Sequence, residues 1–535
     1  MARFTNKQTR KPSGFTATKK DEKPTLTYQG GIGHSKEEKT ELYSRLVTER
    51  FSDTFYESAQ FREGRIVQLA MGLAKSDPVW FSKMVGWLRN DANLRSVSVL
   101  CAAIYANAHK GVSELPEGAL NVRAVCDSAC ARADDPVELL AVYLNLFGRS
   151  LPQGLRNGLG DACRRLWNEY SVLKYNRSAQ VDMRDVLSLA HIKADPKKLN
   201  QDALFSYVID SNYDNELKLE RLPLISKYKT LAKIPRDQRK KFLAENPDQA
   251  EGLTWEFMSS WLGGLDADGW ASAIDQMGYM ALLRNLRNFE KHGVAKPVLQ
   301  KVRDRISDPE EVARSRQLPY RFYSAKVATG SDYFASALND AFETSIDNLS
   351  PLPGRTLVMV DGSGSMMGGG KRIGQSFVSP NEQASVLAAI AISAWDCDVE
   401  IYDTNTKPIT FKNKKSALSN AAEIAKNSHG GGTDTWGCVD SVLASKPKGY
   451  YSRILAFTDG QEGYRDHAWY GWGTSKRDAV DAFKGNVFVW DLSGYSTTNL
   501  DLGIPGRYVF AGFDDNSFSM IERLENGTNI DWPWV

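Results

Sequence analysis

Residues 355–365 read Arg-Thr-Leu-Val-Met-Val-Asp-Gly-Ser-Gly-Ser, a short apolar run that ends in an alternation of glycine and hydroxyl side chains. An apolar run of this length is typical of a strand that is buried on both faces of a parallel sheet. Asp361 ends the run, and glycines between the polar residues permit a tight turn in which Asp361, Ser363 and Ser365 point to one side. The stretch therefore predicts a strand of an α/β sheet with a polar loop at its carboxyl end.

The sequence that follows alternates between strand-like and helical segments. Apolar runs typical of strands lie at 399–402, 453–457 and 487–490, and helical periodicity covers 381–395, 417–426, 436–444 and 475–483. Strands that alternate with helices indicate a doubly wound, mostly parallel sheet covered by helices on both faces. We therefore assign residues 351–535 to an α/β domain.

The sequence before this boundary is helical almost throughout. Apolar residues recur at three- and four-residue steps in segments that include 36–50, 64–75, 78–89, 93–109, 136–147 and 161–173. Because this many consecutive short helices cannot form one compact bundle, they predict an array of stacked helical repeats over residues 26–350. Residues 1–25 are rich in Lys and Arg and lack an apolar segment, which predicts a flexible basic tail and excludes a secretory signal.

The composition limits the class of protein. Of the 535 residues, 42% are hydrophobic and 25% are charged, which excludes disorder over the whole chain. No run of about 18 apolar residues occurs, so we expect no membrane partner, and six cysteines without a disulfide framework predict a reducing compartment, the cytoplasm. Residues 1–350 carry 50 basic and 44 acidic residues, against 17 and 21 in 351–535, which favours nucleic acid as a partner of the first part.

Three loops of the α/β domain carry oxygen ligands that the topology brings together. Asp361, Ser363 and Ser365 follow the first strand, Thr433 lies in a Gly-rich loop before a helix, and Asp459 follows the strand at 453–457. Loops at the carboxyl ends of parallel strands converge at the switch point of an open sheet. Two carboxylates and three hydroxyls suit a small hard cation, so we predict a metal site for a divalent ion, Mg²⁺. The alternative is that these residues serve only in turns and helix caps.

The same residues fill every position of a known motif. The pattern Asp-x-Ser-x-Ser, a distant Thr and an Asp-Gly after a strand resembles the metal-ion-dependent adhesion site of von Willebrand A domains. The resemblance implies that Ser363, Ser365 and Thr433 bind the ion directly or nearly so. It also implies that Asp361 and Asp459 hold the ion directly or through water, and that the ion keeps an open position for an acidic group of a partner.

Other features near these loops point away from catalysis. The loop from Met367 to Pro380 is longer than the usual entry into the following helix and could cover part of the site. Its Gly-Gly-Gly-Lys stretch is no P-loop, because the P-loop pattern needs Gly at 365 and Ser or Thr at 372, where Ser365 and Arg372 stand. The six histidines have no zinc-protease spacing, so we expect no enzymatic activity.

Basic residues gather on helical faces of the first domain. In the helix predicted after Asp182, with Asp185 as its capping-box partner, Arg184 and His191 lie opposite the apolar stripe. Just upstream, Lys174 and Arg177 flank Tyr175, whose ring could stack on a base. Farther along, Arg284 and Arg287 share one face of a helix. We expect these cations to form one continuous track for a polyanion, the alternatives being solvated helix faces and, for His191, a packed core histidine.

A helical first domain before a von Willebrand A domain resembles the TROVE-domain family, that of the Ro autoantigen. The segments that carry this resemblance are 173–175, 185–193, 281–286, 431–434 and 512–514. The resemblance implies a HEAT-like ring of helical repeats, acting as a monomer, that is closed by the A domain. It also implies that small noncoding Y-like RNAs bind the basic outer surface and that single-stranded ends of misfolded RNAs enter the central hole. Lys174 and His191 fall on family positions implicated in Y RNA contact, and an exoribonuclease tethered through the RNA is an implied partner.

We therefore expect a non-catalytic RNA-binding ring that acts in RNA quality control. The sequence leaves one alternative, a metal-dependent protein-interaction scaffold of adhesion type without an RNA role. A third possibility, Mg²⁺-dependent hydrolysis, would require turnover that disappears in Asp361→Ala, and we expect no turnover.

Overall fold

The computed structural model describes residues 25–48, 54, 56–176, 180–210, 216–317, 319–346, 349, 351–367, 379–413, 416–463, 478–512, 516–525 and 532–534. The predicted basic tail therefore lies outside the described residues, apart from its last position, as does most of the loop from Met367 to Pro380. Within the part of the chain that the structure describes, no helix is long and apolar enough to cross a bilayer.

Helices fill the first domain. Their bounds are α1 Glu38–Val47, α2 Ala59–Ser76, α3 Pro78–Asn90, α4 Arg95–Ala108, α5 Val122–Ser128, α6 Asp135–Phe147, α7 Gln153–Leu166, α8 Glu169–Tyr175, α9 Met183–Leu189, α10 Leu199–Ile209, α11 Glu216–Leu219, α12 Pro223–Ala232, α13 Arg239–Glu245, α14 Trp255–Leu262, α15 Ala267–Ile274, α16 Tyr279–Lys291, α17 Lys296–Ser307, α18 Pro309–Ser315, α19 Pro319–Thr329 and α20 Ala335–Ile346. Two short 3-10 helices, Arg236–Gln238 and Pro247–Ala250, flank α13.

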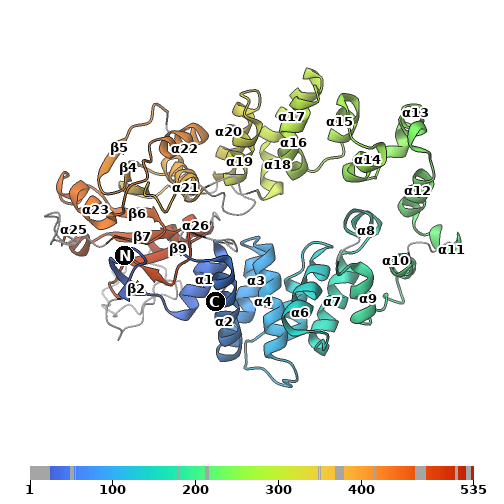
Figure 1. Cartoon of the computed structure of the whole chain (residues 1–535), viewed down its shortest axis with the longest axis horizontal. Helices are drawn as coiled ribbons and strands as arrows, with labels where there is room; N and C mark the ends of the chain where they lie inside the picture. Colours follow the sequence, from blue (N-terminus) through green and yellow to red (C-terminus); the bar gives the residue numbers. More distant parts are fainter. Residues whose placement is uncertain are drawn as a thin grey trace, which may run out of the picture.

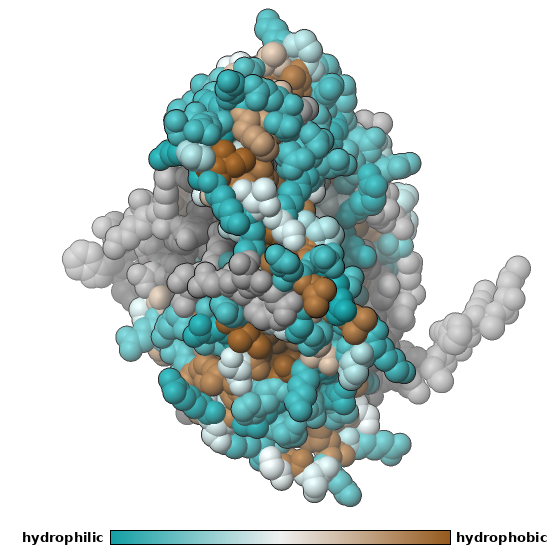
Figure 2. Space-filling model, turned by 90° about the vertical axis from the view of Figure 1, so that its right-hand side faces the viewer, coloured by the Kyte–Doolittle hydropathy of each residue, from teal (hydrophilic) through white to brown (hydrophobic). Residues whose placement is uncertain are grey.

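These helices form a curved array with two limbs (Figure 1). One limb runs from α1 to α9 away from the α/β domain, α10 to α13 make the turn, and α14 to α20 run back. The first helix contacts strand β9 (Arg507–Ala511), and α20 contacts helix α22 (Ala417–Lys426), where Glu343 Oε1 accepts from the Ala417 amide at 3.0 Å. Both ends of the array therefore reach the α/β domain and the chain closes into a ring. Figure 2 shows the side formed by α10 to α13, which is covered largely by hydrophilic side chains.

The α/β domain is built on a six-stranded sheet of order β5-β4-β3-β6-β7-β9. The strands are β3 Thr356–Asp361, β4 Cys397–Tyr402, β5 Thr406–Ile409, β6 Arg453–Thr458, β7 Asn486–Asp491 and β9 Arg507–Ala511. All neighbours pair parallel except β5, which pairs antiparallel with β4 at one edge. The first strand of the domain, β3, is thus central, with Val358 aligned to Val399 on one side and Leu455 on the other.

Helices cover both faces of this sheet. They are α21 Pro380–Ala394, α22, α23 Thr435–Ala444, α25 Asp478–Ala482 and α26 Asn516–Glu525. Alternate residues of β3 point to opposite faces. Accordingly, Val358 shares a core with Leu387 of α21, whereas Leu357 shares a separate core with Trp436 of α23 and Val480 of α25. The α/β fold predicted from residues 355–365 is confirmed.

Two features differ from the predicted boundaries. The segment 161–173 is not one helix, because Asn168 caps a new helix, α8, through a capping box with Ser171 and so ends α7 two residues earlier. The segment before α1 forms a hairpin, β1 (Thr25–Leu26) and β2 (Ile32–Ser35), and β2 pairs with β8 (Thr497–Thr498). This hairpin packs on the α/β domain although it precedes the helical array in sequence.

Candidate metal centre and nucleic-acid interface

The three predicted polar loops meet at the carboxyl edge of the sheet. Asp361 is the last residue of β3, and Asp459 directly follows β6, its neighbour in the sheet. Backbone hydrogen bonds join the first loop to the Gly-rich loop: the Gly430 amide donates to the Gly362 carbonyl at 2.9 Å, and the Gly364 amide to Gly431 at 2.9 Å. The fold therefore brings the sequence-predicted ligands into one place.

Short hydrogen bonds fix the side chains of this site. Asp361 accepts from the Ser363 amide at 2.9 Å and from the Thr458 hydroxyl at 2.6 Å. The Ser363 and Ser365 hydroxyl oxygens lie 3.3 Å apart, and Asp459 accepts from the Gln461 amide at 3.1 Å. All five predicted ligands (Asp361, Ser363, Ser365, Thr433 and Asp459) are buried, with at most 5% of the residue exposed.

Burial and neighbouring carboxylates oppose the ionisation of both aspartates of the site. Burial, followed by the charge of Asp361, raises the pKa of Asp459 to about 8. Burial is also the main cause that raises the pKa of Asp361, and the neighbouring Asp403 adds to it. A bound cation would relieve the cost of ionising two buried carboxylates whose pKa values are both raised.

Thr433 provides an independent indication of a ligand. Its hydroxyl oxygen is buried and has no hydrogen-bond partner among the residues that the structure describes, a state that costs free energy unless something else is bound. The described residues contain no cluster of three or more His, Cys, Asp and Glu side chains suited to a metal. Serine and threonine hydroxyls are not among those four side chains. A site of two carboxylates and three hydroxyls can therefore still hold a metal, and its all-oxygen donor set fits a hard divalent ion.

Asp403 is a residue near this site that the sequence reading missed. It follows β4 directly, as Asp361 ends β3, and its carbonyl accepts from the Asp434 amide at 2.8 Å. A side chain at Gly431 would stand 2.7 Å from the Asp403 carboxylate, so the Gly-rich loop passes against it. The signal was available, because a polar residue at a strand's carboxyl end is the criterion that singled out Asp361.

The α9 region presents its predicted basic residues to solvent. The capping box of Asp182 and Asp185 is present, and Arg184 is exposed. His191 follows the C-cap in the left-handed conformation, with φ of 54°, and the next amide, of Ile192, closes the helix end on the Leu187 carbonyl at 3.0 Å. His191 is exposed, so the alternative of a packed core histidine is wrong.

The other predicted cations have different surroundings. Lys174 is half-buried, lies 3.7 Å from the Glu256 carboxylate of α14, and stands over the ring of Tyr170. Arg177 lies outside the described residues. Arg284 and Arg287 are exposed on α16. Figure 1 places α16 on the limb opposite α9, so the cations form two groups on different limbs and not the expected continuous track.

The helical array contains a cavity of about 640 Å³ that was not predicted. It is formed where α7, α8 and the start of α10 meet, and its lining residues are Arg164, Trp167, Asn168, Glu169, Lys197, Lys198, Leu199, Asn200, Gln201, Leu204 and Leu222. Arg164 Nη1 donates to the carbonyl of Lys193, two residues after His191, at 3.1 Å. The pair Lys197-Lys198 is visible in the sequence, but Arg164 comes from a different helix, so only the fold assembles this basic cavity.

Comparison with known proteins shows which proteins this chain resembles. Residues 248–332 match the model of the TROVE domain. The predicted resemblance to the TROVE-domain family is confirmed. The RNA-binding protein RO60 of Deinococcus radiodurans is 27% identical over 214 residues, which are 36% of this chain and 39% of that protein's length.

A solved structure is similar to this chain over almost the whole fold. The crystal structure of the Deinococcus radiodurans RO (RSR) protein superposes with a TM-score of 0.62 at 19% identity, covering 92% of this chain and all of that one. The helical ring with a mostly parallel sheet, predicted from the sequence, is therefore confirmed as the fold.

Proposed function

We propose that this protein binds RNA through its helical array. The observation that carries the proposal is the cavity between α7, α8 and α10, in whose lining Arg164, Lys197 and Lys198 come together. The similarity to a protein named for RNA binding supports the same function. Phosphate groups supply most of the affinity in such interfaces, and cations with free donor positions are what they require.

The chemistry of the cavity suits a nucleotide. Lys197 and Lys198 are exposed, and neither ammonium group has an ion pair among the described residues, so both can reach phosphates; their backbone amides are held by Asp195, through its carboxylate at 3.0 Å and its carbonyl at 2.9 Å. Leu199 and Leu204 give the lining an apolar part against which a base can pack. Cations for the phosphate together with apolar surface for an unstacked base are typical of single-stranded recognition.

We propose small noncoding, Y-like RNA as the ligand of this outer basic surface and single-stranded ends of misfolded RNA as the ligand of the central opening. Arg184, His191 and Lys174 extend the basic surface along α8 and α9, and Arg284 and Arg287 provide a second set of phosphate contacts on α16. A monomeric ring that holds such RNA would act in RNA quality control without catalysis, with an exoribonuclease reached through the bound RNA.

We further propose that the polar loops hold one Mg²⁺ ion. The buried Thr433 hydroxyl, which has no partner among the described residues, and the raised pKa values of Asp361 and Asp459 support this assignment. Ser363, Ser365 and Thr433 would supply neutral oxygens, and the two aspartates would supply the charge that balances the ion.

Ultraviolet crosslinking tests the RNA proposal. A radiolabelled hairpin RNA with a single-stranded 3′ end is crosslinked to the full chain, and the attached peptides are mapped by mass spectrometry. We expect crosslinked peptides from residues 153–209, which contain α7 to α10. If the RNA does not crosslink, or if its crosslinks fall only in the α/β domain, the proposal is wrong and the protein-interaction scaffold is favoured.

A further inference from the structure

One ion pair joins the two limbs of the helical array near its turn. Lys174 Nζ of α8 lies 3.7 Å from Glu256 Oε1 of α14. Helix α8 belongs to the limb that runs away from the α/β domain, and α14 begins the limb that runs back, so the two helices face each other (Figure 1). Lys174, which we propose as an RNA contact, therefore already meets a carboxylate of its own chain.

The pair between Lys174 and Glu256 is loose. A hydrogen bond from an ammonium to a carboxylate is typically about 2.7–2.9 Å long, and the pair of Lys240 with Asp266 has such a length, 2.7 Å. At 3.7 Å, Lys174 and Glu256 attract each other without a bond of this kind. The second carboxylate oxygen of Glu256, Oε2, is buried and has no partner among the residues that the structure describes. Within this part of the chain, the charge of Glu256 therefore acts mainly on Lys174.

Aromatic rings hold the Lys174 ammonium independently of Glu256. The ammonium lies 5.8 Å from the ring centroid of Tyr170 and 5.6 Å from that of Tyr175, distances at which a ring attracts a cation. The side chain of Lys174 is 25% exposed and that of Glu256 is 28% exposed, so an anion from the solvent can reach the pair. Loss of the carboxylate would therefore leave a cation that is in place and open to a phosphate.

A phosphate and the Glu256 carboxylate compete for this ammonium. Both are anionic acceptors, and the ammonium is a compact charge with three donor positions. A half-exposed ion pair stabilises a fold only weakly, so a phosphate can replace the carboxylate. If the carboxylate stays in place, it repels the incoming phosphate. In both cases Glu256 reduces the free energy that a phosphate gains at Lys174.

We propose that Glu256 occupies the phosphate position of Lys174 in the RNA-free protein and so weakens RNA binding at this point of the array. This inference rests on the RNA binding proposed above. It makes Glu256 a residue that sets the affinity by opposing a ligand, because an anion must break an existing pair to bind there. Since the pair spans the two limbs, a phosphate that replaces Glu256 also breaks this contact between α8 and α14.

Fluorescence anisotropy with the full chain and a labelled hairpin RNA that has a single-stranded 3′ end tests the inference. We expect Glu256→Gln to bind the RNA about two- to fivefold more tightly than the unchanged protein, the range expected when a half-exposed pair no longer has to be broken. The matched control is Asp268→Asn. Asp268 is likewise the second residue of its helix, α15, and is exposed without an ion pair among the described residues. Asp268→Asn should keep the unchanged affinity.

A double-mutant comparison separates the pair from a general change of charge. Lys174→Ala should bind the RNA more weakly than the unchanged protein, and adding Glu256→Gln to it should bring no gain. Glu256→Asp, which draws the carboxylate back from Lys174 by one methylene, should raise the affinity by a smaller factor. It serves if thermal unfolding shows that Glu256→Gln does not fold.

The outcomes distinguish this inference from the proposed function. Competition by Glu256 is wrong, while RNA binding by the array stands, if Glu256→Gln leaves the affinity unchanged or lowers it. The same holds if Asp268→Asn gains as much as Glu256→Gln, or if Glu256→Gln gains equally in the Lys174→Ala background. If the unchanged protein does not bind the RNA, the proposed function is wrong and the inference fails with it.

Discussion

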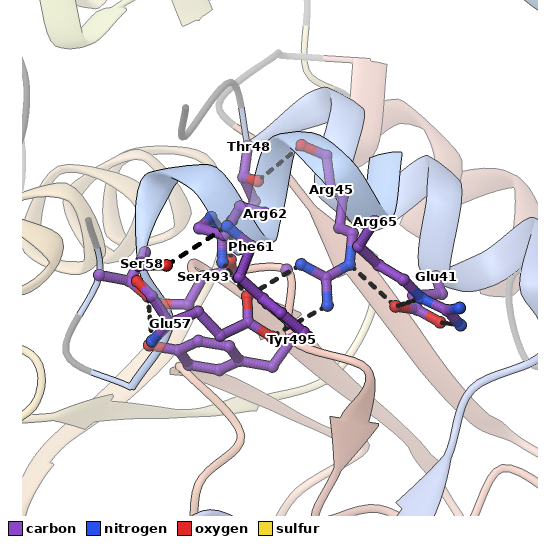
Figure 3. A network of polar contacts seen from close by, with 12 residues as sticks. Glu41, Arg45, Thr48, Glu57, Ser58, Phe61, Arg62, Arg65, Ser493 and Tyr495 are labelled. Atoms are coloured by element: carbon purple, nitrogen blue, oxygen red, sulfur yellow. Dashed lines mark hydrogen bonds and ion pairs between the residues drawn. The ribbon is translucent and has the colours of Figure 1, made fainter. Parts of the chain in front are cut away.

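Arg62 Nη2 donates to the carbonyl oxygen of Ser493 at 2.7 Å, so a guanidinium of helix α2 is buried against the loop that follows β7. The same side chain pairs with Glu57 at 2.7 Å, and Glu57 also accepts from Arg45 at 2.9 and 3.0 Å (Figure 3). A buried network of ion pairs and hydrogen bonds therefore joins the first two helices of the array to the α/β domain. Such pairs stabilise a specific arrangement chiefly because breaking one leaves a buried charge unpaired.

Glu57→Gln should strongly destabilise the protein. The substitution keeps the side-chain volume but removes the carboxylate, so the buried guanidinium groups of Arg45 and Arg62 both lose their ion pair with Glu57. We expect a loss of about 3–5 kcal/mol in the free energy of unfolding, measured by urea denaturation. Lys240→Gln is the control, because its ion pair with Asp266 is exposed and is worth less than about 1 kcal/mol. Equal losses in the two variants would contradict this account of the ring closure.

Mg²⁺ affinity should fall as the pH is lowered through 8. Because burial and Asp361 raise the pKa of Asp459 to about 8, the metal-free site holds a proton below that pH, and the ion must displace it. The affinity at pH 6.5 should be roughly 20-fold weaker than at pH 8.5, a difference that calorimetry can measure. In the metal-free protein, the raised pKa of Asp459 also predicts that the free energy of unfolding falls as the pH rises from about 4 to 8. Affinity that does not change with pH would contradict the assignment of Asp459 as a ligand.

His191→Gly should separate backbone strain from RNA contact. His191 has φ of 54°, where glycine is favoured, so the substitution should raise stability by about 0.5–1 kcal/mol, measured by thermal unfolding. His191→Ala removes the same imidazole but keeps the strain. We expect both variants to bind hairpin RNA more weakly and only the glycine variant to gain stability. RNA affinity that stays unchanged in both would remove His191 from the interface.

Local interactions made the first parts of the structure predictable. The strand at 356–361 and the cap formed by Asp182 and Asp185 depend on residues that are close in sequence, and both were predicted. Asp361 and Asp459 could be placed together because parallel strands end at one edge. The start of α8 was missed because Asn168 caps it within a continuous apolar pattern.

Long-range pairings account for what the sequence left open. The hairpin at 25–35 pairs with residues 497 and 498, and no periodicity in either segment specifies the other. The basic cavity was missed for the same reason, since Arg164 joins Lys197 and Lys198 only after α7 and α10 pack.

The central claim, that the cavity between α7 and α10 binds RNA, is tested most directly by the affinity of Lys197→Glu/Lys198→Glu for a labelled hairpin RNA with a single-stranded 3′ end. Fluorescence anisotropy over a range of salt concentrations gives both the affinity and its salt dependence. The matched control is Lys446→Glu/Lys448→Glu, which reverses two exposed cations on the α/β domain. The account predicts that the first pair weakens binding about tenfold or more and lowers the slope of log K against log salt by about 1.4, as expected for two lost phosphate contacts, while the control pair changes neither. Equal affinity of the Lys197→Glu/Lys198→Glu variant and the unchanged protein would contradict the claim.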